Sequence, residues 1–109
     1  MAETRKVLGQ LLPAAATLSA LYTVPASTQT VVSSITVCEE GGAATTYKIS
    51  VAVNGAVDAT SQYIAFSAAL QANETKALTL GITLGTGDVI RVLSASGNVA
   101  FSAFGVELT

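Results

Sequence analysis

The sequence contains no histidine, no tryptophan and only one cysteine, and these absences exclude several kinds of chemistry. Without imidazole the chain cannot carry out Ser-His-Asp hydrolysis or Cys-His catalysis, and it cannot hold a His-ligated zinc ion. The single cysteine, Cys38, cannot form a disulfide within the chain or a cysteine-cluster metal site. A reactive thiol, or a bridge to another copy of the chain, is one role open to Cys38. Free cysteine more often behaves as a small buried apolar side chain, and we predict this role for Cys38 at the end of a strand.

Charged residues are also scarce, at 11% of the 109 residues, whereas an average soluble domain has about a quarter. The net charge of −2 leaves no basic surface for a phosphate backbone, so we expect no nucleic-acid partner. No apolar run reaches the roughly 18 residues of a spanning helix, so we expect no membrane partner either. Arg5 and Lys6 precede an apolar stretch, as in a secretory signal, but Gln10 and Pro13 interrupt it and favour retained structure.

The acidic residues give little sign of catalysis. A glycosidase-like pair would need two carboxylates in one cleft, usually beside an aromatic platform, yet only three Tyr and three Phe are present. Most of the acids lie in predicted turns, where a carboxylate is solvated or caps a backbone N–H group. Glu39, Glu40 and Asp58 lack the spacing of a calcium loop. We therefore expect no enzyme activity, cofactor or metal, and keep a carboxylate-dependent hydrolase as the enzyme alternative.

Most of the chain reads as short strands separated by turn residues, which predicts an all-β fold: a single antiparallel β-sandwich of jelly-roll type. In residues 46–53, Tyr47, Ile49, Val51 and Val53 alternate with polar or small residues and predict one buried face. Asn54 and the glycine after it suit a tight turn. The other expected strands are residues 21–24, 30–38, 63–67, 75–84, 89–93 and 99–108, with Val31, Ile35 and Val37 sharing a face of the second.

The last of these segments contains a change of phase. Val99, Phe101 and Ala103 share one face of a regular strand, whereas Phe104, Val106 and Leu108 share the other. A strand with a period of two cannot bury both sets, so we predict a β-bulge or a change of sheet near Ala103 and Phe104. If the strand is regular, either Phe101 or Phe104 must face a partner chain.

Residues 1–20 do not follow the strand pattern, and we predict an N-terminal arm of residues 1–20 before a sandwich domain of residues 21–109. A turn or two of helix after Pro13 is one form of the arm, and an extended segment is the other. In the extended form the apolar side chains of the arm would be buried against another subunit. The candidate interface residues are Val7, Leu8, Leu11, Leu12 and Leu18.

The predicted outward positions of the strands are mostly Thr, Ser and Ala. Soluble domains usually surround their core with mixed charges, and charged groups are depleted from the cores of protein interfaces. A soluble domain with a Thr/Ser coat would also fit this pattern. We favour the alternative that much of this surface is covered in an oligomer or a larger assembly.

Several stretches, in the same order along nearly the whole chain, resemble small β-sandwich virion proteins of tailed bacteriophages, especially cyanophages. They are Lys6-Val7-Leu8-Gly9-Gln10, Leu21-Tyr22-Thr23-Val24-Pro25, Val31-Val32-Ser33-Ser34-Ile35-Thr36-Val37-Cys38, Tyr63-Ile64-Ala65, Leu78-Thr79-Leu80-Gly81-Ile82-Thr83-Leu84 and Phe104-Gly105-Val106-Glu107-Leu108-Thr109. The resemblance implies a structural component of a phage particle and no catalytic residue.

Two positions on the particle are then open. A capsid decoration, or cement, protein would sit on the head surface as a homo-oligomer, a dimer or trimer, and bind the major capsid protein. A tail, baseplate or fibre-associated protein would instead contact the host. The expected arm favours decoration, because an extended segment can lie across a neighbouring subunit. The shortage of Trp, Tyr and Arg argues against a receptor-binding tip. Either protein would be made in the host cytoplasm and reside in the virion.

Overall fold

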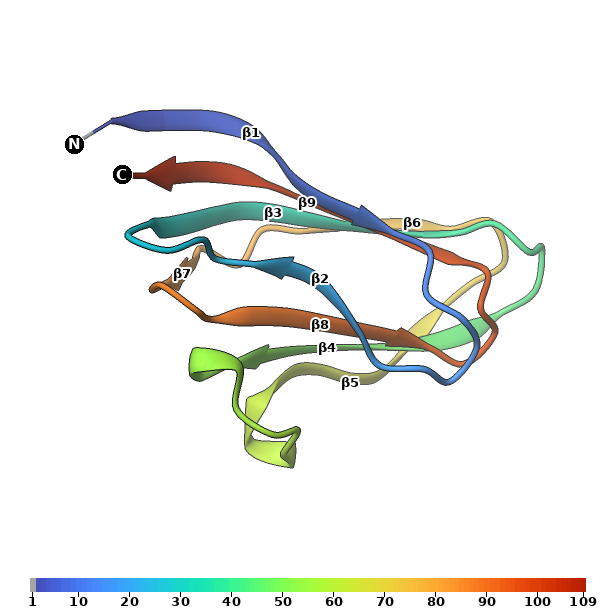
Figure 1. Cartoon of the computed structure of the whole chain (residues 1–109). Helices are drawn as coiled ribbons and strands as arrows, with labels where there is room; N and C mark the ends of the chain where they lie inside the picture. The colour runs from blue at the N-terminus through green and yellow to red at the C-terminus, as the bar shows by residue number, and fades with distance from the viewer. Residues whose placement is uncertain (1) are drawn as a thin grey trace.

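The computed structural model describes residues 2–109 and is built almost entirely of β-strands in two antiparallel sheets packed face to face (Figure 1). Met1, the first residue of the expected arm, lies outside the described residues. The strands are β1 (Glu3–Leu11), β2 (Ser19–Thr23), β3 (Gln29–Glu39), β4 (Thr45–Ala52), β5 (Tyr63–Leu70), β6 (Thr75–Leu78), β7 (Ile82–Leu84), β8 (Val89–Ser94) and β9 (Val99–Leu108). Two short 3-10 turns, η1 (Val53–Gly55) and η2 (Thr60–Gln62), separate β4 from β5. The predicted all-β sandwich is confirmed.

The strand order is that of a jelly roll. The first sheet has the order β1-β9-β3-β6, with β7 continuing beside β3, and the second sheet has the order β2-β8-β4-β5. The chain passes between the sheets after β1, β2, β3, β5, β7 and β8, so neighbours within a sheet come from distant parts of the sequence. The side chains that face inward from both sheets form one hydrophobic core, as expected for a sandwich. Its largest fully buried members include Phe101, Ile35, Ile49, Leu70 and Ile90.

Residues 3–11 form an edge strand, and this corrects the prediction of a separate arm over residues 1–20. The strand β1 pairs along its length with β9, from Glu3 opposite Leu108 to Leu11 opposite Phe101. After a turn at residues 15 and 16 the chain enters β2 in the other sheet, without the helix considered after Pro13. The boundary between residues 20 and 21 therefore falls inside β2, and removal of residues 1–20 would take away an integral strand.

The phase change in residues 99–108 is real, but the bulges lie on the two neighbouring strands. The strand β9 itself alternates regularly and buries Phe101, while Phe104 lies on the opposite face. The register shifts at Leu8 in β1, opposite Ala103 and Phe104, and at Ser33 in β3, opposite Phe104 and Gly105. A Cβ atom on Gly105 would overlap the carbonyl oxygen of Val31, so glycine permits this close approach.

Two other strand predictions are corrected in detail. The bulge at Ser33 inverts the alternation in β3, so Ile35 and Val37 are in the core while Val31 lies on the outer face. The expected strand of residues 75–84 is divided into β6 and β7, because Gly81 has a positive φ of 61°.

The prediction for β4 is confirmed at Tyr47 and Ile49, which are buried, and at Val51, which packs against the core. Val53 does not join this buried face, because it begins η1 and is 69% exposed. The segment from η1 to η2 folds beneath the second sheet (Figure 1).

Candidate functional site

The outer face of the first sheet is the first candidate surface. Residues that stand opposite one another on neighbouring strands share a face of the sheet, so the register places Phe104, Val31 and Val7 together on the side away from the core. Its further members are Glu3, Arg5 and Gln10 of β1, Gln29, Ser34, Thr36 and Cys38 of β3, Thr75 and Ala77 of β6, Thr83 of β7, and Ala100, Ser102, Val106 and Leu108 of β9.

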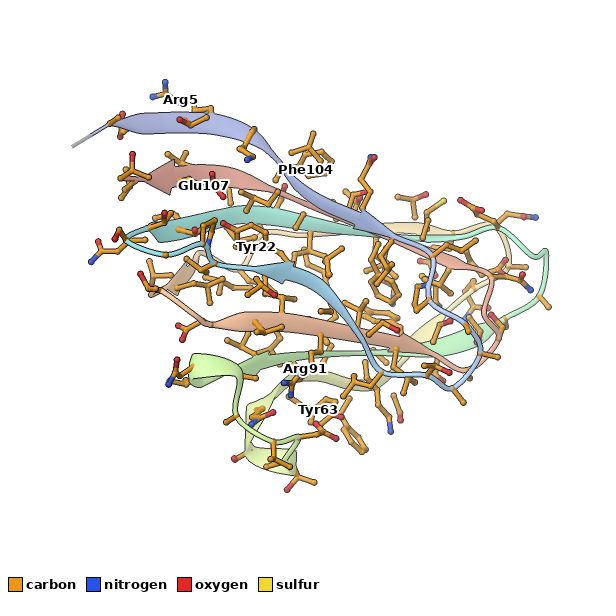
Figure 2. All side chains as sticks on the ribbon, viewed as in Figure 1. Arg5, Tyr22, Tyr63, Arg91, Phe104 and Glu107 are labelled. Carbon is orange, nitrogen blue, oxygen red and sulfur yellow. The ribbon has the colours of Figure 1, made fainter. Side chains whose placement is uncertain are left out.

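Charge is nearly absent from this outer face. Its only ionisable side chains of Asp, Glu, Lys or Arg within residues 2–109 are Glu3 and Arg5, which lie together at one corner. In Figure 2, Arg5 and Phe104 lie on the side of the first sheet that faces away from the second. Cys38 is half-buried on this face near the end of β3, so its prediction as a buried strand-end residue is confirmed in part. A broad, weakly charged sheet face is well suited to packing against another protein.

The five predicted interface residues are not brought together on an exposed arm. Val7 is 48% exposed on the outer face of β1, and Leu12, just after the strand, is 54% exposed. Leu8 and Leu11 instead pack against the core from within the sandwich. Leu18 is half-buried just before β2. Of the five, only Val7 belongs to the outer face of the first sheet. Among the apolar side chains that accompany it there, Phe104 and Val106 were signalled in the sequence only by the change of phase.

A smaller exposed cluster lies on the second sheet. The rings of Tyr63 and Phe66 meet edge to face with 5.2 Å between centroids, and the Lys48 ammonium lies 4.3 Å from the Phe66 centroid. Phe66 is 58% exposed and Ile64 is 45% exposed, so this cluster is accessible from solvent. Arg91 ties the nearby η1 turn to the sheet by donating to the carbonyl oxygens of Ala56 at 2.8 Å and Gly55 at 3.3 Å.

A buried polar cluster joins the two sheets at one end of the sandwich. Tyr22 of β2 donates its hydroxyl proton to Glu107 of β9 at 2.6 Å, and its oxygen lies 2.8 Å from the buried Thr30 hydroxyl of β3. Lys6 of β1 also donates to Glu107, at 3.2 Å. Burial, together with the bond to Glu107, raises the pKa of Tyr22 to about 12. The bond from Tyr22, helped by Lys6, holds the pKa of Glu107 below its ordinary value.

Another carboxylate, that of Glu39, joins two loops. It accepts backbone hydrogen bonds from Asn73 at 2.9 Å, from Gly41 at 2.8 Å and from Gly42 at 2.9 Å. The bond from Asn73, reinforced by the two glycine N–H groups, lowers the pKa of Glu39. The carboxylate therefore links the β3–β4 loop to the turn between β5 and β6.

Two further acids in turns, Asp88 and Glu74, have similar partners. Asp88 accepts from the backbone N–H groups of Asn54 at 2.8 Å and Gly85 at 2.9 Å, and Glu74 accepts from Gln71 at 2.7 Å. The prediction that turn acids cap backbone N–H groups is confirmed for Glu39, Glu74 and Asp88, whereas Asp58 accepts from the hydroxyl of Tyr63 instead. Within residues 2–109, no group of three or more His, Cys, Asp or Glu side chains is arranged to hold a metal ion.

A hollow of about 400 Å³ opens beside β3 and β7. It is lined by Gln29, Thr30, Val31, Thr83, Leu84, Gly85 and Leu108, and none of these side chains is ionisable. The hollow therefore does not bring two carboxylates together, as the hydrolase alternative would require. In the part of the chain that the structure describes, no helix is long and apolar enough to cross a membrane.

Comparison of the chain with protein-family models, with curated proteins and with solved structures found no match. The surfaces described above, and the resemblance of the sequence to phage virion proteins, therefore remain as the guides to function.

Proposed function

We propose that this chain is a structural protein of a tailed-phage virion and serves as a capsid decoration protein on the head. Its partner would be the major capsid protein, and it would stabilise the head by bridging capsid subunits. The jelly-roll fold does not distinguish this role from host adhesion, because both capsid proteins and lectins use that fold. The observation that carries the proposal is the weakly charged outer face of the first sheet.

The outer face replaces the N-terminal arm as the proposed contact. Apolar area removed from water there contributes roughly 25 cal/mol per Å², before the cost of association. Contacts repeated over a capsid lattice add by multivalency, so the affinity of each site can be low. Phe104, Val106 and Val31 supply apolar area, while Ser102 and Thr36 keep the centre of the face small and uncharged.

Immunogold labelling of intact virions with an antibody against this chain tests the position on the particle. Label distributed over the head supports decoration, whereas label confined to the tail end overturns it.

The surface itself is tested by adding purified variants to heads assembled without the chain. Ser102→Lys places a charge in the middle of the proposed contact and should abolish binding. Thr46→Lys is the matched control, because Thr46 is a half-buried hydroxyl residue on the second sheet. Equal binding by both variants would exclude the outer face.

The exposed cluster of Tyr63, Phe66 and Lys48 favours the second candidate, a tail, baseplate or fibre-associated protein with a role in host adhesion. Exposed aromatic rings beside a cation can stack on a sugar face or anchor a protein contact. This role predicts that the isolated protein binds host cells and that Phe66→Ala weakens the binding. The decoration role predicts that neither the wild-type chain nor the Phe66→Ala variant binds host cells.

A further inference from the structure

The free edge of β1 suggests how two copies of the isolated chain could associate. This inference does not depend on the proposed function. Among the described strands, only β9 pairs with β1, so the other side of β1 faces solvent. An unpaired strand edge is a template for pairing with another strand. Residues 3–7 are exposed, and the bulge at Leu8 interrupts the edge beyond them.

The backbone orientation along β1 follows from the hydrogen-bonded pair at its start. Ala2 and Thr109 exchange both backbone hydrogen bonds, at 2.7 and 2.9 Å. Hydrogen-bonded positions alternate along an antiparallel pair, so Thr4 also directs its N–H and C=O groups toward β9. Glu3 and Arg5 consequently direct theirs toward the free edge, where another strand could accept and donate.

The side chains at these two positions carry opposite charges. Arg5 and Glu3 lie on the same face of β1, with 3.9 Å between the guanidinium and the carboxylate, and their side chains are 81% and 57% exposed. An exposed pair of this kind within one strand contributes little to stability. It does, however, make the edge self-complementary, because the same two charges can pair across a twofold axis.

We propose that two copies of this chain pair through β1, antiparallel, about a twofold axis at Thr4. In this register Glu3 of each copy stands opposite Arg5 of the other. The two pairs exchange four backbone hydrogen bonds, and each sets opposite charges side by side, which stabilises a cross-strand pair. The pairing joins the two first sheets into one continuous sheet.

The other symmetric registers are less favourable. An axis at Arg5 sets the two Arg5 side chains opposite each other, and an axis at Glu3 does the same with two carboxylates; both place like charges together. An axis at Lys6 would place Glu3 of one copy opposite Gly9 of the other, beyond the bulge at Leu8 that interrupts the edge. Registers centred between residues would pair groups that point toward the free edge with groups that point toward β9.

Lys6 does not block the edge, although an inward-pointing lysine is a common device against strand pairing. Its side chain is 45% exposed on the face of β1 that carries Thr4, and its ammonium lies 3.2 Å from the Glu107 carboxylate of the same copy. The charge is therefore matched within each copy. The contact is small compared with a stable dimer interface, so we expect a weak dimer that salt dissociates further.

Sedimentation equilibrium over a range of concentrations at low salt tests the charge arrangement. Arg5→Glu and Glu3→Arg each create two like-charge contacts and should weaken the dimer by about tenfold or more. The double variant E3R/R5E exchanges the charges and should restore wild-type association. Glu40→Arg, a change at an exposed loop residue, is the control and should leave association unchanged. A wild-type chain that stays monomeric, or single variants that associate like wild type, would overturn the proposal.

Crosslinking tests the register independently. Opposed Thr4 residues form a non-hydrogen-bonded pair with about 4.5 Å between Cα atoms, which is within the range of a disulfide. In a Cys38→Ser background, Thr4→Cys should form a covalent dimer on mild oxidation. Thr75→Cys, exposed on β6 at the opposite edge of the sheet, should not. Equal crosslinking of the two variants, or none from Thr4→Cys, would refute the register.

Discussion

Replacing Tyr22 with phenylalanine removes one oxygen atom from the cluster that joins the two sheets. Tyr22 is 7% exposed, and its hydroxyl group lies 2.6 Å from Glu107 and 2.8 Å from Thr30. Because the single hydroxyl proton goes to the carboxylate, the Thr30 hydroxyl donates to the tyrosine oxygen. The variant therefore loses a hydrogen bond to a charged group and leaves the buried Thr30 hydroxyl without that partner.

A hydrogen bond to a charged group contributes about 1.5–3 kcal/mol, so we expect Tyr22→Phe to lower the free energy of unfolding by about 2 kcal/mol. With a urea m-value of about 2 kcal/mol/M, the midpoint should fall by about 1 M. Equilibrium urea unfolding, followed by far-ultraviolet circular dichroism, measures this shift. The aromatic ring stays in place, so the change should not alter the fold.

Tyr63→Phe is the matched control. It also removes a tyrosine hydroxyl that donates to a carboxylate, that of Asp58 at 3.1 Å, but this contact is exposed. Surface changes of this kind cost about 0.5 kcal/mol or less. A double-mutant cycle of Tyr22→Phe with Glu107→Gln should show coupling, because the two residues are in direct contact. Equal losses in the two tyrosine variants, together with no coupling, would refute the assignment of stability to the buried cluster.

Two further perturbations test other parts of the fold. Because the folded-state pKa of Glu39 is lowered, its carboxylate stabilises the fold above the ordinary pKa, and this contribution is lost as pH falls through the folded-state value. Glu39→Gln should therefore lower the urea midpoint at pH 7 and change it less at pH 3; a difference independent of pH would contradict this account. Gly105→Ala should lower the melting temperature strongly, because a Cβ there overlaps Val31, whereas Gly85→Ala has room and should change it little. Similar melting temperatures for these two glycine variants would show that β3 can move aside.

The sequence predicted the core-facing side of a strand well where the alternation is regular. In β4 the alternation places Tyr47 and Ile49 in the core, as expected, although Ser50 and Ala52 at the end of the strand are buried as well. The prediction was wrong at Val31 because the bulge at Ser33 shifts the period by one residue. No local signal marks that bulge, because it lies where Gly105 comes close to β3, and Gly105 belongs to a strand that is distant in sequence.

Residues 3–11 were predicted as an arm for a related reason. An edge strand with a bulge at Leu8 has no sustained alternation, and its first four residues are polar or charged. The contact between Tyr22 and Glu107 was also beyond the reach of sequence patterns, because 85 residues separate the partners. The outer face could be predicted as poor in charge from composition, but its membership depends on the register between strands.

The position of β9 between β1 and β3 has a consequence for how the chain acquires its fold. The other eight described strands precede β9 along the sequence, so during synthesis β1 and β3 emerge before the strand that joins them. At 5–20 residues per second, roughly five to twenty seconds separate the emergence of residue 3 from that of residue 108. Throughout that interval the first sheet lacks its central strand and the core lacks Phe101. We therefore expect the native sandwich to form late, in a single step that depends on the arrival of β9, and at the slow rates typical of folds dominated by distant contacts.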